Sequence, residues 1–213
     1  MIDYRARQSP VVDQGHRGIC AACAVTAAHE WCLGLGLSIE DAHWNGKQRD
    51  PWRNEEATSI AHILPALTDR GHADEATWPL NAPAWPGPPP AESRLPANRR
   101  ATPNWRRLDN PSPARIHAEL AQRVVVLGLD FVPSAWDWGS PLVHAENGEK
   151  PVLGHAVLAV GEAQYDGHNA VMIRNSWGTR WGDRGFGYVS DTYLRHYLRS
   201  AYSLECANLS EAA

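Results

Sequence analysis

Two cysteines three residues apart, Cys20 and Cys23, stand in the stretch "DQGHRGICAACAVT" near the start of the chain. Such a pair can form half of a zinc site, act as a redox couple, or supply one working thiol beside a packing residue. A zinc site needs a second ligand pair, which the sequence lacks, and a redox couple needs a preceding strand. The pattern therefore favours Cys20 as a single nucleophile and Cys23 as a small core residue. Reversible Cys20–Cys23 oxidation stays open as an off-switch.

A cysteine nucleophile needs a favoured thiolate and donors for the developing oxyanion. Cys20 opens an Ala-rich run, so we expect it at the start of a helix, where free backbone N–H groups and the helix dipole favour an anion. Gln14 precedes it by six residues on the Gly-containing loop "QGHRG". This loop can turn the Gln14 amide toward the thiol as an oxyanion donor.

A base for that thiol is offered by His155 in "LGHAVLAVG", at the start of a predicted strand. Asn175 in "IRNSWG" ends the next predicted strand. Adjacent antiparallel strands bring the two side chains together, and an Asn carbonyl that accepts the imidazole N–H fixes the tautomer of the ring. A lone His on an apolar strand is more often structural, but the three segments together favour catalysis.

The elements that must position these residues divide the chain into a helical first half and a sheet-rich second half. We expect helices over residues 19–33, 38–47, 58–71 and 114–122, with Pro65 distorting the third of them. Strands are expected over residues 124–131, 154–163, 168–177 and 185–190. Ten of the sixteen prolines fall between Pro79 and Pro113, including "WPGPPP", so this stretch is expected to be an extended surface loop.

Composition narrows the class of protein. The 213 residues are 43% apolar and carry a net charge of −4, which indicates a globular chain without the basic footprint of a nucleic-acid or membrane-surface binder. The first residues hold no long apolar run, so we expect neither a signal peptide nor an anchor. Four cysteines are too few for a disulfide scaffold, which predicts a reducing, cytoplasmic setting with Cys32 and Cys206 as inert buried thiols. The preference for Arg over Lys suggests a GC-rich genome.

Three segments together resemble a known family. "QGHRGICAACA", "GHAVLAVG" and "IRNSWGTRWGDRGFGYV" are similar to the cysteine, histidine and asparagine segments of papain-like (family C1) cysteine peptidases. Weaker similarity between them extends the resemblance over residues 10–193. It implies a single α+β domain over residues 1–213. Residues 15–110 would form a helical lobe, residues 1–14 and 111–213 an antiparallel β-barrel-like lobe, and the active site would lie between the lobes.

The resemblance also implies residue roles. Cys20 would be the nucleophile, His155 the acid and base, Asn175 the residue that orients His155, and Gln14 the oxyanion donor. Trp177 would shield the His–Asn hydrogen bond from water. Substrate would bind along Ala57, Gly154 and Trp177, with a peptide or protein as the partner and no metal or cofactor.

Departures from the family pattern refine this expectation. Arg17 stands where many secreted members carry a cysteine that forms a disulfide, which agrees with a cytoplasmic enzyme. Ala57 occupies a position often held by Gly. The Gln14 loop begins almost at the first residue, which predicts a bacterial-type short form without a propeptide. Two alternatives stay open: a dedicated peptide-processing acyltransferase or ligase, and an inactive binding module. The sequence does not predict an oligomeric state.

Overall fold

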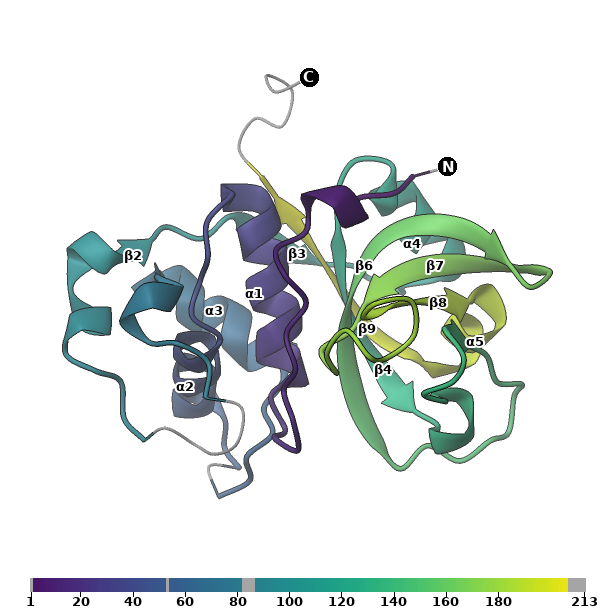
Figure 1. The fold of residues 1–213 in the computed structure, drawn as a ribbon, viewed down its shortest axis with the longest axis horizontal. Helices are drawn as coiled ribbons and strands as arrows, with labels where there is room; N and C mark the ends of the chain where they lie inside the picture. Colours follow the sequence, from purple (N-terminus) through teal and green to yellow (C-terminus); the bar gives the residue numbers. More distant parts are fainter. Residues whose placement is uncertain (1, 53, 82–86, 207–213) are drawn as a thin grey trace.

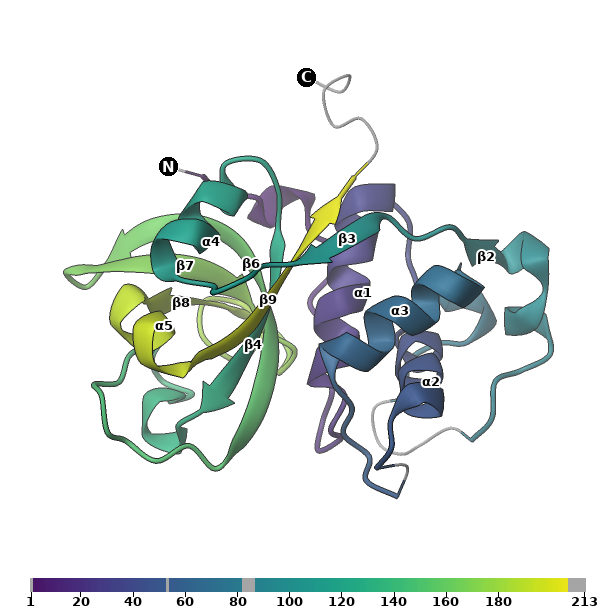
Figure 2. The same cartoon turned by 180° about the vertical axis from the view of Figure 1, so that it is seen from behind.

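The computed structural model describes residues 2–52, 54–81 and 87–206, and they form two lobes side by side (Figure 1). One lobe holds the helices α1 (Cys20–Leu33), α2 (Ile39–Arg49) and α3 (Ile60–Arg70). The other is built on a seven-stranded sheet, and the view from behind shows α1 between that sheet and the other two helices (Figure 2).

The helices begin and end where local sequence dictates. The Ala-rich run of α1 has high helix propensity and ends at Gly34, whose φ of 68° is the left-handed conformation that glycine adopts most easily. Ser38 caps α2, since its hydroxyl accepts the Asp41 N–H at 3.1 Å. α3 runs through Pro65 without ending there. Within the described ranges no helix is long and apolar enough to cross a membrane.

The sheet has the strand order β3-β9-β4-β6-β7-β8-β5. Its pairs are antiparallel except β5 with β8, which is parallel, and the described strands at its two edges, β3 and β5, do not pair with each other. The sheet is therefore mixed rather than purely antiparallel, within the two-lobe α+β fold that the sequence predicted. Its strands are β3 (Asn104–Arg107), β4 (Val125–Phe131), β5 (Leu142–Val143), β6 (Leu153–Tyr165), β7 (His168–Arg174), β8 (Phe186–Ser190) and β9 (Leu198–Glu205). α4 (Pro113–Leu120) and α5 (Asp191–Tyr197) complete this lobe.

The proline-rich stretch contains more structure than an extended loop. β1 (His72–Ala73) pairs with β2 (Arg99–Arg100), and two single 3-10 turns, Glu92–Arg94 and Pro96–Asn98, precede β2. The first residues of "WPGPPP" lie outside the described residues. The chain then enters the large sheet at β3, a few residues before the expected lobe boundary at residue 111.

One apolar cluster joins the lobes. Side chains along α1, such as Ala24 and Ala28, pack with Val126 of β4 and with Leu158 and Val160 of β6. Burial of such side chains is the main stabilising contribution to a fold of this size. The same contact fixes the start of α1 against the start of β6, where the two predicted catalytic residues lie.

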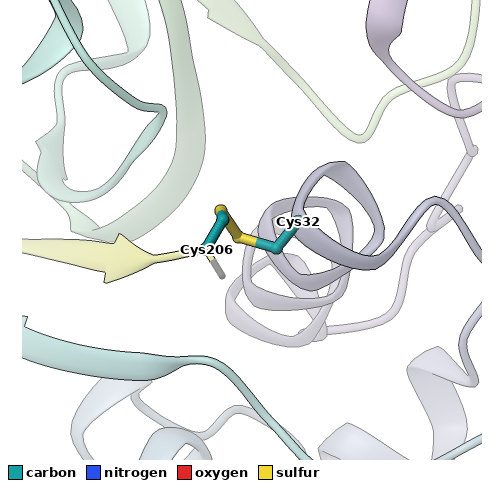
Figure 3. Close-up of a disulfide and its surroundings, with 2 residues drawn as sticks. All are labelled: Cys32 and Cys206. Atoms are coloured by element: carbon teal, nitrogen blue, oxygen red, sulfur yellow. A yellow bond between two sulfur atoms is a disulfide. The ribbon is translucent and has the colours of Figure 1, made fainter. Parts of the chain in front are cut away.

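A disulfide also joins the lobes. Cys32, near the end of α1, is bonded to Cys206, directly after β9 and 174 residues further along the chain (Figure 3). The prediction that these two cysteines are inert thiols is therefore wrong. A pairing between residues so far apart leaves no local sequence signal. The cytoplasmic setting stays a prediction. It rested partly on the expectation that all four cysteines are free thiols, and this disulfide removes that argument.

Candidate active site

A cleft of about 580 Å³ lies where the lobes meet, lined from one side by the residues before and at the start of α1 and from the other by β4 and β6. Six of the seven predicted site residues line this cleft: Gln14, Cys20, Ala57, Gly154, His155 and Trp177. The seventh, Asn175, lies behind His155 and is buried. These seven residues come from four separate parts of the sequence and converge on one place.

Cys20 is the first residue of α1, as predicted, and it is half-buried. Burial raises the pKa of its thiol, while hydrogen bonds from the backbone N–H groups of Ala156, Ala21 and Cys20 itself oppose that shift. The contact with Ala156 places the sulfur beside the strand residue that follows His155. Backbone donors at a helix start favour a thiolate and can also stabilise an oxyanion.

His155 is held by Asn175. The His155 Nε2 and Asn175 Oδ1 atoms are 2.9 Å apart, and the Ser176 backbone N–H donates to the same oxygen at 2.8 Å. Because that oxygen accepts, Nε2 must carry the proton, and neutral His155 keeps an unprotonated Nδ1. Burial lowers the pKa of His155 to about 4, although the hydrogen bond to Asn175 acts in the opposite direction.

Aromatic rings enclose this histidine. The ring centroids of Trp177 and Trp136 each lie 5.0 Å from that of His155, and Phe131 lies 6.0 Å away. They surround the buried His–Asn pair, as a shielding role for Trp177 requires, and that role stays a prediction. Sequence reasoning missed the other two, although Phe131 ends a predicted strand that reaches the site. Trp136 lies in an irregular segment with no periodic signal.

Gln14 is fixed at three atoms. Its backbone N–H donates to the Ser176 carbonyl at 2.8 Å, its Oε1 accepts from the Ser176 hydroxyl, and its Nε2 donates to the Arg17 carbonyl at 2.6 Å. An amide nitrogen carries two hydrogens, so one remains for an oxyanion in the cleft. Sequence reasoning assigned no role to Ser176, and its place directly after Asn175 was the available signal.

The substrate wall of the cleft is set by small residues. A side-chain carbon on Gly18 would come within 3.2 Å of the Ala57 backbone nitrogen, so the Cys20 loop and the Ala57 segment pack closely. On the opposite wall, a side-chain carbon on Gly128 would lie 2.5 Å from the Ser200 hydroxyl. Glycine at position 128 therefore lets Ser200 of β9 lie directly against β4 on this wall.

Cys23 points away from the cleft chemistry. It is only 4% exposed, lies in the apolar cluster that joins the lobes, and burial raises the pKa of its thiol. The part of the chain that the structure describes gathers no three His, Cys, Asp or Glu side chains in a metal-binding arrangement. The packing interpretation of Cys23 therefore accounts best for its place.

Comparisons with known proteins find similarity to cysteine peptidases. A family model described as "Papain family cysteine protease" matches residues 96–200. Cysteine proteinase 2 of Entamoeba histolytica is 23% identical over 201 residues, covering 87% of this chain and 61% of that protein. Peptidase 1 of Dermatophagoides pteronyssinus is 32% identical over 99 residues, covering 44% of this chain and 31% of that protein.

Solved structures show the same fold. Xylellain, a cysteine protease from Xylella fastidiosa, matches with a TM-score of 0.80 at 21% identity, over 97% of this chain and 86% of that one. Bromelain from Ananas comosus, solved in complex with the E64 inhibitor, matches with a TM-score of 0.73 at 17% identity, over 97% of this chain and 98% of that one.

Fold and site together define a two-lobe α+β protein with a thiol, an imidazole and an amide gathered in the cleft between its lobes. The chain is similar to papain-like (C1) cysteine peptidases in the family model it matches, in these relatives and in its fold, which confirms the predicted resemblance. It spans 61% of the length of the first curated relative and 31% of the second. The bacterial source and the absence of a propeptide stay predictions.

Proposed function

We propose that this protein is a cysteine peptidase that hydrolyses peptide bonds through an acyl-enzyme on Cys20. The observation that carries the proposal is the convergence of Gln14, Cys20 and the hydrogen-bonded pair His155–Asn175 on one cleft. A nucleophile, a base, a residue that orients the base and an oxyanion donor are the parts that acyl transfer requires.

The residues divide the reaction between them. Cys20 gives its proton to Nδ1 of His155 and its sulfur attacks the scissile carbonyl, while Gln14 Nε2 and the Cys20 backbone N–H hold the oxyanion. Protonated His155 passes the proton to the departing amine, which leaves the acyl group on Cys20. His155 then takes a proton from water, and the hydroxide attacks the acyl carbon. The C–S bond breaks, the acid leaves, and the proton on His155 returns to the Cys20 sulfur. Asn175 keeps the ring in place throughout.

Hydrolysis of a peptide library tests this proposal. We expect cleavage by the wild type, and its loss in Cys20→Ala and His155→Ala. Cleavage at the wild-type rate in both variants would contradict the catalytic roles of Cys20 and His155. An unreactive Cys20 toward iodoacetamide at neutral pH would instead support an inactive binding module.

One feature favours a second use of the same acyl-enzyme, transfer to an amine. The exposed Trp138 indole stacks on Trp177 with centroids 5.9 Å apart and planes at 19°, and Leu153 is exposed on the rim of the cleft. This apolar ledge beside His155 suits an amine with an apolar side chain that competes with water. Mass spectrometry with added amino acid amides tests it, and products of hydrolysis alone would argue against transfer.

A further inference from the structure

Arg17 is a buried residue at the wall of the cleft, and its side chain lies between two carboxylates. Its guanidinium donates to both oxygens of Glu40, at 2.5 and 3.1 Å, and its Nε donates to Glu56 Oε1 at 2.9 Å. It also donates to the Asn81 carbonyl at 2.9 Å. The side chain of Arg17 is 4% exposed and that of Glu40 is fully buried. A buried guanidinium held in a bidentate contact has little freedom to reach a substrate.

The backbone around Arg17 holds the proposed oxyanion donor. The Arg17 carbonyl accepts the Gln14 Nε2–H at 2.6 Å, and the next residue, Gly18, donates its N–H to Glu56 Oε2 at 3.1 Å. Glu56 therefore binds the loop twice, with one oxygen on the Arg17 side chain and the other on the Gly18 backbone. The close packing of Gly18 against Ala57 holds the same two segments together.

We propose that Arg17 and Glu56 are positioning residues that hold Gln14 where its amide meets the oxyanion. Glu40 anchors the arginine from α2, and the ion pairs cross-link the loop at the position where the resemblance implies a cysteine. This inference rests on the proposed function, because it concerns the same reaction. It predicts that loosening the clamp weakens oxyanion stabilisation and leaves the Cys20 thiol itself unchanged.

Glu56→Gln is the sharpest variant, because it replaces one of two acceptor oxygens by a donor at a side chain that is 39% exposed. Its matched control is Glu55→Gln, the same change at the exposed neighbouring residue. We expect Glu56→Gln to lower kcat about 10-fold with KM within about 2-fold of the wild type, part of the full effect of losing one oxyanion donor. The control should match the wild type.

Two further readouts separate positioning from a general loss of structure. The rate of Cys20 alkylation by iodoacetamide needs no oxyanion donor, so it should be the same in Glu56→Gln as in the wild type. A peptide aldehyde, which forms a hemithioacetal with Cys20, should bind about 10-fold more weakly to the variant, in parallel with kcat. Arg17→Lys, which keeps the charge beside Glu40 but loses the planar fork, should show the same pattern.

The outcomes distinguish the two proposals. Unchanged kcat and aldehyde affinity in Glu56→Gln, with a normally active wild type, would overturn the clamp alone. A parallel fall in alkylation would also overturn it, because the thiol rather than Gln14 would then be displaced. A wild type without Cys20-dependent turnover would contradict the peptidase function and the clamp together.

Discussion

At the scale of single residues, the site couples two groups that burial keeps uncharged. Burial raises the pKa of Cys20 and lowers that of His155 to about 4, since each charge alone would lie away from water. Transfer of the proton from Cys20 to His155 creates both charges at once, and their attraction offsets the penalty. The thiolate of Cys20 should therefore depend on His155.

The pH dependence of Cys20 alkylation tests this coupling. In the wild type we expect iodoacetamide to react well below the ordinary thiol pKa of about 8.5, because His155 holds the proton. In His155→Ala, burial still raises the pKa of Cys20 without a compensating cation, so reaction should begin above that value. The rate at pH 6.5 should fall by about 100-fold or more. Overlapping profiles from pH 5 to 10 would contradict the coupling.

Asn175 should act through the direction of the His155 ring. Asn175→Ala removes the 2.9 Å hydrogen bond to Nε2, which leaves the buried ring free to turn or to adopt the other tautomer. We expect kcat/KM to fall by about 10- to 100-fold, mainly through kcat. Asn169→Ala, at an exposed position on the same strand β7, is the control and should leave kcat/KM unchanged. A loss of less than about 2-fold in Asn175→Ala would remove the orienting role.

At the scale of elements, the segments with strong local patterns were predictable and the long-range partners were not. The Ala-rich run and Gly34 defined α1, and the apolar alternation around His155 and Asn175 defined β6 and β7. The segment "QGHRGICAACA" was sufficient to predict the places of Gln14 and Cys20. By contrast, β9, α5 and the ring of Trp136 were not predicted, because their places depend on packing between distant segments. The role of Arg17 became visible only with Glu40 and Glu56 beside it.

A buried pair of histidines joins α1 to β1. His72 Nε2 lies 3.0 Å from the Ser38 carbonyl, so it carries a proton, and His72 Nδ1 then accepts from His29 Nδ1 at 3.1 Å. His29 Nε2 is buried, with no hydrogen-bond partner in the described part of the chain. Burial lowers the pKa of both histidines, so the folded protein holds them neutral.

This pair makes folding sensitive to acid. Below about pH 6.5 the unfolded chain binds protons on these histidines that the folded protein does not, so stability is fully present above that pH and falls below it. Each histidine should lower the free energy of unfolding by up to about 1.4 kcal/mol per pH unit. Urea unfolding at pH 7.5, 6.5 and 5 measures the slope. His29→Gln should flatten it, the exposed control His16→Gln should not, and equal slopes in all three proteins would contradict the assignment.

At the scale of the whole molecule, the lobes are held by one apolar cluster and by one covalent link. The cleft is formed by residues from both lobes, so its geometry depends on how α1 lies against β6 and β9. Cys20 and Cys32 stand at opposite ends of α1, one in the cleft and the other in the disulfide. The link to Cys206 therefore fixes the nucleophile's helix to the sheet at the end away from the cleft.

Reduction of the Cys32–Cys206 disulfide should destabilise the whole fold. A cross-link between residues 174 apart restricts the unfolded chain strongly, which corresponds to a stabilisation of about 5 kcal/mol in the chain-entropy account. We expect reductant to lower the urea midpoint of the wild type clearly. The double variant Cys32→Ser/Cys206→Ser should unfold at the midpoint of the reduced wild type and show no further response to reductant. Cys20→Ser serves as the control for the free thiol, and it should respond to reductant as the wild type does. If reductant lowered the urea midpoint of the double variant as much as that of the wild type, the destabilisation would arise elsewhere. If reductant left the midpoint of the double variant unchanged, the Cys32–Cys206 disulfide would be a main stabilising contact between the lobes that form the cleft.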